Sequence, residues 1–135
     1  MTADHIRIIE QAAEFQTKHD SEALASLFAY DGVFEDIPFG AAAQGHAGMR
    51  AFWEETWAAM PDSTMTLVSA VADHRRGGAE WIMTATQTGG FQDHPATGKA
   101  FSLRAAAMVE FADGRIRQWS DYWSLFDFKR QVGLT

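Results

Sequence analysis

The run Trp119-Ser120-Asp121-Tyr122-Trp123 places an aspartate between two tryptophans. Residues two apart on a β-strand point to the same face, so an extended conformation would set the Asp121 carboxyl between two indole rings. Burial against apolar walls disfavours the charged form of an acid and raises its pKa toward the range useful for proton transfer. Asp121 is therefore a candidate general base or acid. The alternative is a structural aspartate at a strand end, solvated or capping a backbone amide of the next turn.

A second candidate acid, Asp36, lies in the run Phe34-Glu35-Asp36-Ile37-Pro38. In an extended conformation Asp36 shares its face with Phe34, while Glu35 points the other way. Two carboxyls in one apolar pocket push their pKa values apart, so that one stays charged as a base and the other stays protonated as a donor. The alternative is that Asp36 only leads into the turn before Pro38.

Other catalytic chemistries have no signature in the sequence. The chain has no cysteine, which excludes a thiolate nucleophile and cysteine-based metal sites, and it has no GxSxG, Walker or strand–GxGxxG motif. We therefore predict no cofactor and no metal, because the histidines are scattered without the spacing of a ligand cluster. One of them, His46 in Gly45-His46-Ala47-Gly48, is kept as a candidate at a pocket mouth, the alternative being a surface or helix-entry role. The histidines are His5, His19, His46, His74 and His94.

Charge and hydropathy limit the partners. Eleven Lys and Arg against 18 Asp and Glu give a net charge of -7, which repels phosphate backbones, so we expect no nucleic-acid partner. The first residues lack the apolar run of a signal peptide or membrane span, so we expect a cytoplasmic protein that does not bind membranes. With 135 residues and 47% hydrophobic side chains, the chain should form one domain, residues 1–135.

Hydrophobic spacing predicts three helices in the first half of the chain. Apolar residues recur at helical intervals over residues 6–17, and Asp20 caps a short second helix that should end near Asp31-Gly32. A short strand over residues 33–37 follows, then a loop, and then a third helix over residues 49–60.

The second half predicts a sheet. Long runs rich in Val, Ile, Thr and aromatic residues alternate with turn residues, which indicates an antiparallel meander and hence an α+β fold. The strands are apolar on both faces, and three helices cover only one face, so we expect a homodimer through the outer face, the alternative being a monomer. A bulge is expected after Gly114, where Ile116 would otherwise point outward. The predicted strands span residues 65–74, 79–89, 101–111 and 115–123.

The order of these features resembles the nuclear transport factor 2-like superfamily over nearly the whole chain. Its nearest groups are the SnoaL-like polyketide cyclases, the ketosteroid isomerases and the limonene-epoxide hydrolases. The resemblance implies a cone, in which a strongly curved antiparallel sheet wraps around three N-terminal helices in a cystatin-like α+β barrel and encloses an apolar pocket. It also implies a homodimer that pairs through the outer sheet face. The matching segments are Phe34 to Gly40, Gly45 to Gly48, Pro95 to Lys99, Ala112 to Ile116, Trp119 to Trp123 and Gln131 to Leu134.

The resemblance also assigns roles to single positions. In limonene-epoxide hydrolases the acid of the closing W-x-D-Y motif works at the pocket floor, and Asp121 matches it. Their early-strand Tyr and Asn are matched by Phe34 and Asp36, but their Arg and Asp on a middle strand fall on Thr84 and Thr86, so that catalytic set is incomplete. In SnoaL-like cyclases a single pocket Asp transfers the proton. The oxyanion-hole tyrosine of ketosteroid isomerases has no counterpart in the first helix.

We therefore expect a cofactor-free enzyme that moves a proton next to the carbonyl of a small hydrophobic compound, as an isomerase, cyclase or dehydratase. Asp121 would be the base, and Asp36 the partner acid or a substrate-orienting group. One alternative is a non-catalytic module that binds a hydrophobic ligand in the cavity, or a protein through the outer sheet face near Trp81 and Met83. Another is an epoxide hydrolase with an incomplete catalytic set. The expected substrate-binding residues are Phe34, Thr84, Thr86, Leu103, Ala105, Trp119, Trp123 and His46.

Overall fold

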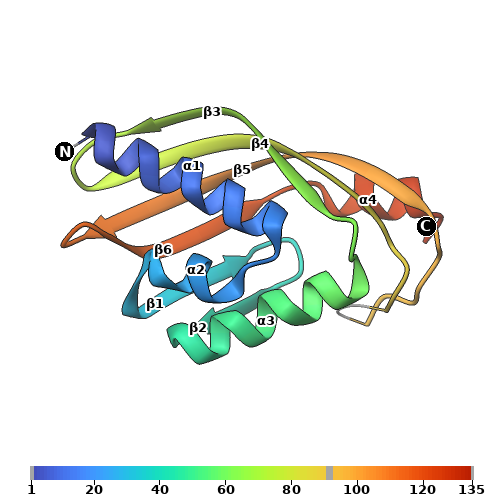
Figure 1. Ribbon diagram of the computed structural model, residues 1–135. Helices are drawn as coiled ribbons and strands as arrows, with labels where there is room; N and C mark the ends of the chain where they lie inside the picture. Colours follow the sequence, from blue (N-terminus) through green and yellow to red (C-terminus); the bar gives the residue numbers. More distant parts are fainter. Residues whose placement is uncertain (1, 91–92, 135) are drawn as a thin grey trace.

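A computed structural model of the chain describes residues 2–90 and 93–134 (Figure 1). Three helices precede and interrupt a six-stranded sheet, and a fourth helix follows it. The elements are α1 (Thr2–Lys18), α2 (Ser21–Ser26), β1 (Phe28–Asp36), β2 (Ala41–Gln44), α3 (Gly45–Ala59), β3 (Thr64–Ala72), β4 (Arg76–Thr86), β5 (Ala100–Ala112), β6 (Arg115–Tyr122) and α4 (Leu125–Val132).

The sheet is open and strongly curved, with strand order β2-β1-β6-β5-β4-β3. Figure 1 shows α1, α2 and α3 lying along one side of it, so the α+β fold expected from the sequence is confirmed. Neighbouring strands are antiparallel except for β1 and β6, which run parallel. That parallel pair joins the N-terminal and C-terminal strands and brings residues about 85 positions apart into register.

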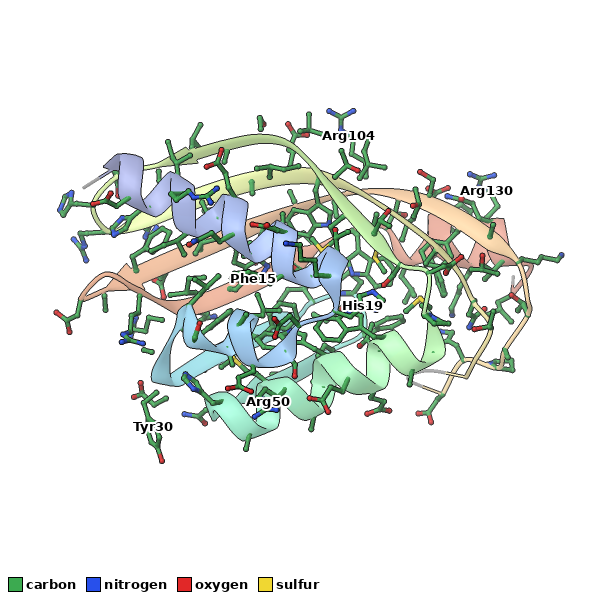
Figure 2. All side chains as sticks on the ribbon, in the orientation of Figure 1. Phe15, His19, Tyr30, Arg50, Arg104 and Arg130 are labelled. Carbon is green, nitrogen blue, oxygen red and sulfur yellow. The ribbon has the colours of Figure 1, made fainter. Side chains whose placement is uncertain are left out.

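The inner face of the sheet carries the core. Along β5 buried and exposed residues alternate, as expected for a strand with one face packed and one face solvated. The outward residues of β5 are mixed rather than uniformly apolar: Ser102, Arg104, Ala106, Met108 and Glu110. In Figure 2 the labelled Arg104 projects from the side of the sheet away from α1. The inward, buried residues of β5 are Phe101, Leu103, Ala105, Ala107, Val109 and Phe111.

The expected bulge in the last strand is confirmed. Glu110 pairs with Gln118 and Phe111 pairs with Ile116, so one residue of β6, Arg117, is left over. The extra residue shifts the side-chain parity of β6. As a result Ile116 and Trp119 both point inward and are fully buried.

The structure differs from the sequence-based prediction at three places: the end of the second helix, the segment after β1 and the C-terminal segment. The second helix ends at Ser26, and Asp31-Gly32 lies inside β1, where the register to β6 shifts between Phe28 and Val33. Gly32 suits that irregularity, because a Cβ there would lie 3.0 Å from the carbonyl oxygen of Ala29. The strand β2 and the helix α4 were not predicted.

The helix α4 covers a free stretch of the β5 edge. The strand β6 ends at Tyr122, opposite Ala106, so the beginning of β5 has no β6 partner. The side-chain amide of Gln131 takes that place: its oxygen accepts from the Ser102 N–H at 2.9 Å, and its nitrogen donates to the Ser102 carbonyl at 2.8 Å. This docking brings Phe128 of α4 against the inner side of the sheet. None of the helices in the described ranges is long and apolar enough to cross a membrane.

Candidate active site

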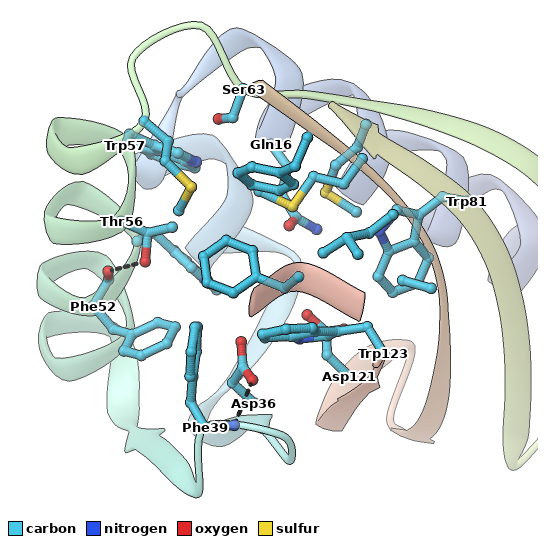
Figure 3. A pocket seen from close by; sticks show the side chains of 18 of the residues that line it. Gln16, Asp36, Phe39, Phe52, Thr56, Trp57, Ser63, Trp81, Asp121 and Trp123 are labelled. Carbon is cyan, nitrogen blue, oxygen red and sulfur yellow. Dashed lines mark hydrogen bonds between the residues drawn. The ribbon is translucent and has the colours of Figure 1, made fainter. Parts of the chain in front are cut away.

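The two candidate acids are neighbours across the parallel strands. Asp36 at the end of β1 is in register with Asp121 on β6, and Phe34 is in register with Trp119. Side chains in register on adjacent strands stand on the same face of the sheet, and strands lie about 4.8 Å apart. Both carboxyls therefore enter one cavity, as Figure 3 shows.

Each carboxyl accepts a hydrogen bond from one tryptophan of the run Trp119 to Trp123. The indole N–H of Trp119 donates to Asp121 Oδ1 at 2.5 Å. Asp36 accepts from the side chain of Trp123 and from the backbone N–H of Phe39, the latter at 3.2 Å. The W-x-D-x-W motif thus supplies one of the acids and one indole donor to each acid.

Burial makes the two acids electrostatically unequal. Desolvation raises the pKa of Asp36 to about 6, while the hydrogen bonds from Phe39 and Trp123 oppose this rise. Asp121 is only 8% exposed, and desolvation raises its pKa well above the usual value. The negative charge of Asp36 raises the pKa of Asp121 further, against the hydrogen bond from Trp119. Desolvation and the charge of Asp36 therefore both favour the protonated form of Asp121, and the two carboxyls titrate as a coupled pair.

The cavity around the acids is walled by aromatic rings and methionines. Its volume is about 90 Å³. Carbon and ring surfaces dominate the wall, which suits an apolar ligand held against a few polar groups. Its apolar lining consists of Phe34, Phe39, Phe52, Trp53, Trp57, Met60, Met65, Trp81, Met83, Phe101, Leu103, Ala105, Trp123 and Phe128.

A second set of polar residues lies away from the acids. Figure 3 places Gln16 of α1 and Ser63 at the opposite end of the cavity from Asp36 and Asp121. The Ser63 hydroxyl lies 2.9 Å from Nε2 of His19, whose ring stacks on Trp57 at 4.9 Å between centroids. Each end of the cavity therefore offers hydrogen-bonding groups, with rings between them.

Gln87 is another polar residue in the wall. Its side chain is only 1% exposed and binds the loop that follows β4, donating to the Pro95 carbonyl at 3.0 Å and accepting from the Thr97 hydroxyl at 2.9 Å. Gln87 therefore closes the cavity structurally rather than offering free polar atoms. In the described part of the chain the indole N–H of Trp53 is a buried donor without a hydrogen-bond partner.

Most of the sequence-predicted residues meet at this cavity. Asp36 and Asp121 line it, and so do Phe34, Leu103, Ala105 and Trp123. Trp119 is packed behind Asp121, 1% exposed, and acts on the site through its hydrogen bond to that carboxyl.

Three predicted site residues lie elsewhere. Thr84 and Thr86 point outward from β4, where their hydroxyls bond to Thr64 at 2.8 Å and to Asp62 at 2.7 Å. His46 lies at the start of α3, with Nε2 3.0 Å from the carbonyl oxygen of Phe28. Its ring therefore ties α3 to β1 and does not reach the cavity wall.

Trp81 and Met83 were expected on the outer sheet face and instead line the cavity. The inward and outward faces of β4 were predicted the wrong way round. The run Trp81-Ile82-Met83 is apolar at every position, so no alternation with polar residues marks the faces. The same error placed the two threonines inside.

The helix residues that line the cavity were not predicted from the sequence, and the last helix was missed altogether. Ser124 caps α4 by accepting from the Asp127 N–H at 3.0 Å, and Gly133 ends it in the left-handed conformation, with φ 78°. These are ordinary start and stop signals, and they would have revealed the helix that carries Phe128. No comparable signal marks Gln16 or Ser63. Among the described residues no three His, Asp or Glu side chains gather as metal ligands would.

Comparison with known proteins agrees with this geometry. Residues 9–119 match the family described as "SnoaL-like domain". Among solved structures, a candidate polyketide cyclase from Xanthomonas campestris pv. campestris is 19% identical, with a TM-score of 0.86, and the match covers 97% of this chain and 98% of that one. IdmH, a candidate polyketide cyclase from Streptomyces antibioticus, is 24% identical, with a TM-score of 0.78 and coverage of 94% and 96%.

A third similar structure comes from Catenulispora acidiphila DSM 44928. That protein has a ketosteroid isomerase-like fold, was crystallised in complex with trimethylamine, and is 23% identical to this chain. The TM-score is 0.84, and the match covers 95% of this chain and 93% of that one. At these identities the likeness establishes the fold.

Proposed function

Because the chain belongs to the SnoaL-like domain family, we propose that it is a cofactor-independent acid–base enzyme that acts on a small hydrophobic carbonyl compound. The reaction is of the isomerase, cyclase or dehydratase type, and it begins with removal of a proton from the carbon next to the carbonyl. The observation that carries the proposal is the pair of in-register carboxyls, Asp36 and Asp121, inside one aromatic cavity.

The unequal burial of the two acids supports a division of roles opposite to the one expected from sequence. Asp36 is the base, because its pKa of about 6 leaves it ionised yet still basic near neutral pH. Asp121 is the donor, because burial and the charge of Asp36 keep its proton in place. A neutral carboxylic acid in an apolar site can hydrogen-bond to a developing enolate oxygen.

The proposed step balances without another reactant. Asp36 takes the proton from the carbon, the C–H electron pair forms the new C=C bond, and the carbonyl π electrons move to oxygen, where Asp121 donates a hydrogen bond. Return of the proton to a different carbon gives an isomer. Attack of the enolate carbon on a second carbonyl of the same molecule gives a ring.

The cavity wall supports a neutral, apolar substrate. Rings of Phe34, Phe52 and Trp81 keep water from the acids, which strengthens the hydrogen bonds made there. Epoxide hydrolysis has weaker support, because the threonines at the two positions that match the Arg and Asp of limonene-epoxide hydrolases, Thr84 and Thr86, point away from the cavity.

The test is proton exchange rather than turnover of a guessed substrate. Wild-type protein in D₂O is mixed with small cyclic ketones such as 2-tetralone, and loss of the α-proton signal is followed by NMR. We expect exchange above the buffer rate in the wild type and a loss of about 10²–10⁴-fold in Asp36→Asn. Ligand binding without exchange across the panel would refute the enzyme and support the non-catalytic binding module.

We also propose that the protein is a cytoplasmic homodimer that pairs through the outer face of the sheet. The support is a row of outward positions that crosses four strands, from Val71 through Gly78 and Met108 to Ser120. Val71 is 68% exposed and Met108 is 53% exposed, so this row presents apolar area to solvent.

A further inference from the structure

Among the described residues that line the cavity, none has a basic side chain that could pair with the Asp36 carboxylate. The described residues that line the cavity include no Lys, Arg or His, and none of the ion pairs found in the described ranges involves Asp36 or Asp121. The Asp36 carboxylate is held by two N–H groups, one of Phe39 and one of Trp123, which orient it but leave its net charge in place. A buried carboxylate without a counter-ion is costly, and a cationic ligand removes that cost.

Aromatic rings flank this carboxylate. Figure 3 shows the Asp36 carboxyl between the rings of Phe39 and Trp123. Those two rings meet edge to face, with centroids 4.8 Å apart at an angle of 77°. The ring of Phe128 lies 6.2 Å from Phe39 and 5.8 Å from Trp123, again close to perpendicular. Rings turned in different directions present π faces from several sides, and π faces attract cations.

We propose that the cavity binds small organic cations, with an alkylated ammonium group held between the Asp36 carboxylate and the rings of Phe39 and Trp123. The proposal shares with the proposed function the cavity and the ionised Asp36 carboxylate, but it does not depend on catalysis. The new element is that the cavity prefers positively charged ligands. Cations bound there occupy the base, so they compete with a neutral carbonyl substrate, and anionic compounds are excluded.

The experiment compares two probes of nearly the same shape. Choline carries a trimethylammonium head, and 3,3-dimethylbutan-1-ol has the same branched head without the charge. Binding is measured by isothermal titration calorimetry and by the fluorescence of Trp53, Trp57, Trp81 and Trp123, which line the cavity. We expect choline to bind one site per chain at least about fivefold more tightly than the neutral alcohol.

Three variants locate the binding. Asp36→Asn should abolish the preference for choline and leave or improve the binding of the neutral alcohol. Phe39→Leu, which keeps an apolar side chain but removes the π face, should weaken choline binding about threefold or more and change alcohol binding less. Glu22→Gln removes one negative charge on the exposed side of α2 and should change neither, which controls for attraction by the acidic surface.

Equal affinities for the two probes, or a preference for choline that survives Asp36→Asn, would overturn the proposal. Circular dichroism melting curves of each variant check that it is folded before it is titrated. The readout is binding alone, so choline binding without proton exchange would retain this inference and remove the proposed enzyme. Proton exchange without choline binding would remove this inference and retain the proposed enzyme.

Discussion

Asp36 and Asp121 stand in register on parallel strands, yet the protein solvates their carboxyls differently. Asp121 is only 8% exposed and accepts a hydrogen bond from Trp119, whereas Asp36 is less completely buried and accepts from Phe39 and Trp123. Because two like charges this close repel, ionisation of one suppresses ionisation of the other. The negative charge of Asp36 therefore favours the protonated form of Asp121.

Substitution of the two β4 threonines tests whether the site predicted from sequence or the site seen in the structure is the active one. Thr84→Ala and Thr86→Ala should leave the proton-exchange rate within about twofold, because both hydroxyls face outward. Asp121→Asn should lower the rate by about 10²–10³-fold, since it removes the proposed carboxylic acid donor. The rates are compared by NMR at one ketone concentration, with folding checked by circular dichroism. The assignment would be wrong if either threonine substitution lowered the proton-exchange rate strongly while Asp121→Asn left it unchanged.

The pH dependence of the proton-exchange rate should reflect the titration of Asp36 and Asp121. Exchange by the wild type should rise with pH through about 6 as Asp36 loses its proton, because only the carboxylate can act as the base. It should fall at higher pH, where Asp121 ionises and no longer donates. The midpoints belong to the coupled pair rather than to single residues. A rate that is flat between pH 5 and 7 would contradict the assignment of Asp36 as base.

The same two acids should make the folded protein less stable as the pH rises. An acid whose folded pKa is raised binds more protons in the folded than in the unfolded state, so the free energy of unfolding falls between the unfolded value and the folded one. For Asp36 this window runs from about 4 to about 6, and the loss is about 2–3 kcal/mol at most, because the side chain is partly exposed. For Asp121 the loss continues to higher pH.

Asp36→Asn tests this sign, because asparagine cannot ionise. Urea unfolding at pH 5 and pH 8 should show the variant gaining stability relative to the wild type at the higher pH. Measuring the difference between the two proteins largely removes the titration of other groups, including the carboxyls of Asp62 and Asp73, whose pKa values are lowered by hydrogen bonds. If the variant instead becomes less stable relative to the wild type between pH 5 and pH 8, the Asp36 carboxylate is satisfied by partners in the folded state.

The alternation of side chains along the strands predicted the two acids of the site better than it predicted the residues of the cavity wall. Spacing of two residues put Asp121 on the face of Trp119, and Asp36 on the face of Phe34, because those strands contain polar residues that fix the phase. No local pattern could predict that β1 and β6 are neighbours, since the pairing joins the two ends of the chain. The convergence of the acids was therefore a hypothesis until the sheet order was known.

The β4 strand shows why the rest could not be predicted. Trp81, Ile82 and Met83 are all apolar, so neither face is marked, and only pairing with β3 and β5 decides that Ile82 points outward. The resemblance to epoxide hydrolases then aligned residues with the wrong face. Residues such as Gln16 reach the cavity through the seating of α1 on the sheet, which depends on tertiary packing rather than on periodicity.

The proposed homodimer predicts that a charge at the centre of the outer face separates the subunits. Met108 lies in register between Gly78 on β4 and Ser120 on β6, so it occupies the middle of the outer row. Met108→Glu should convert a dimer to a monomer in light scattering after size exclusion, because burying an unpaired carboxylate in an interface is strongly unfavourable. Ala58→Glu on the exposed side of α3 adds the same charge and should remain dimeric. A monomeric wild type, or a Met108→Glu dimer as stable as the control, would rule out pairing through this face.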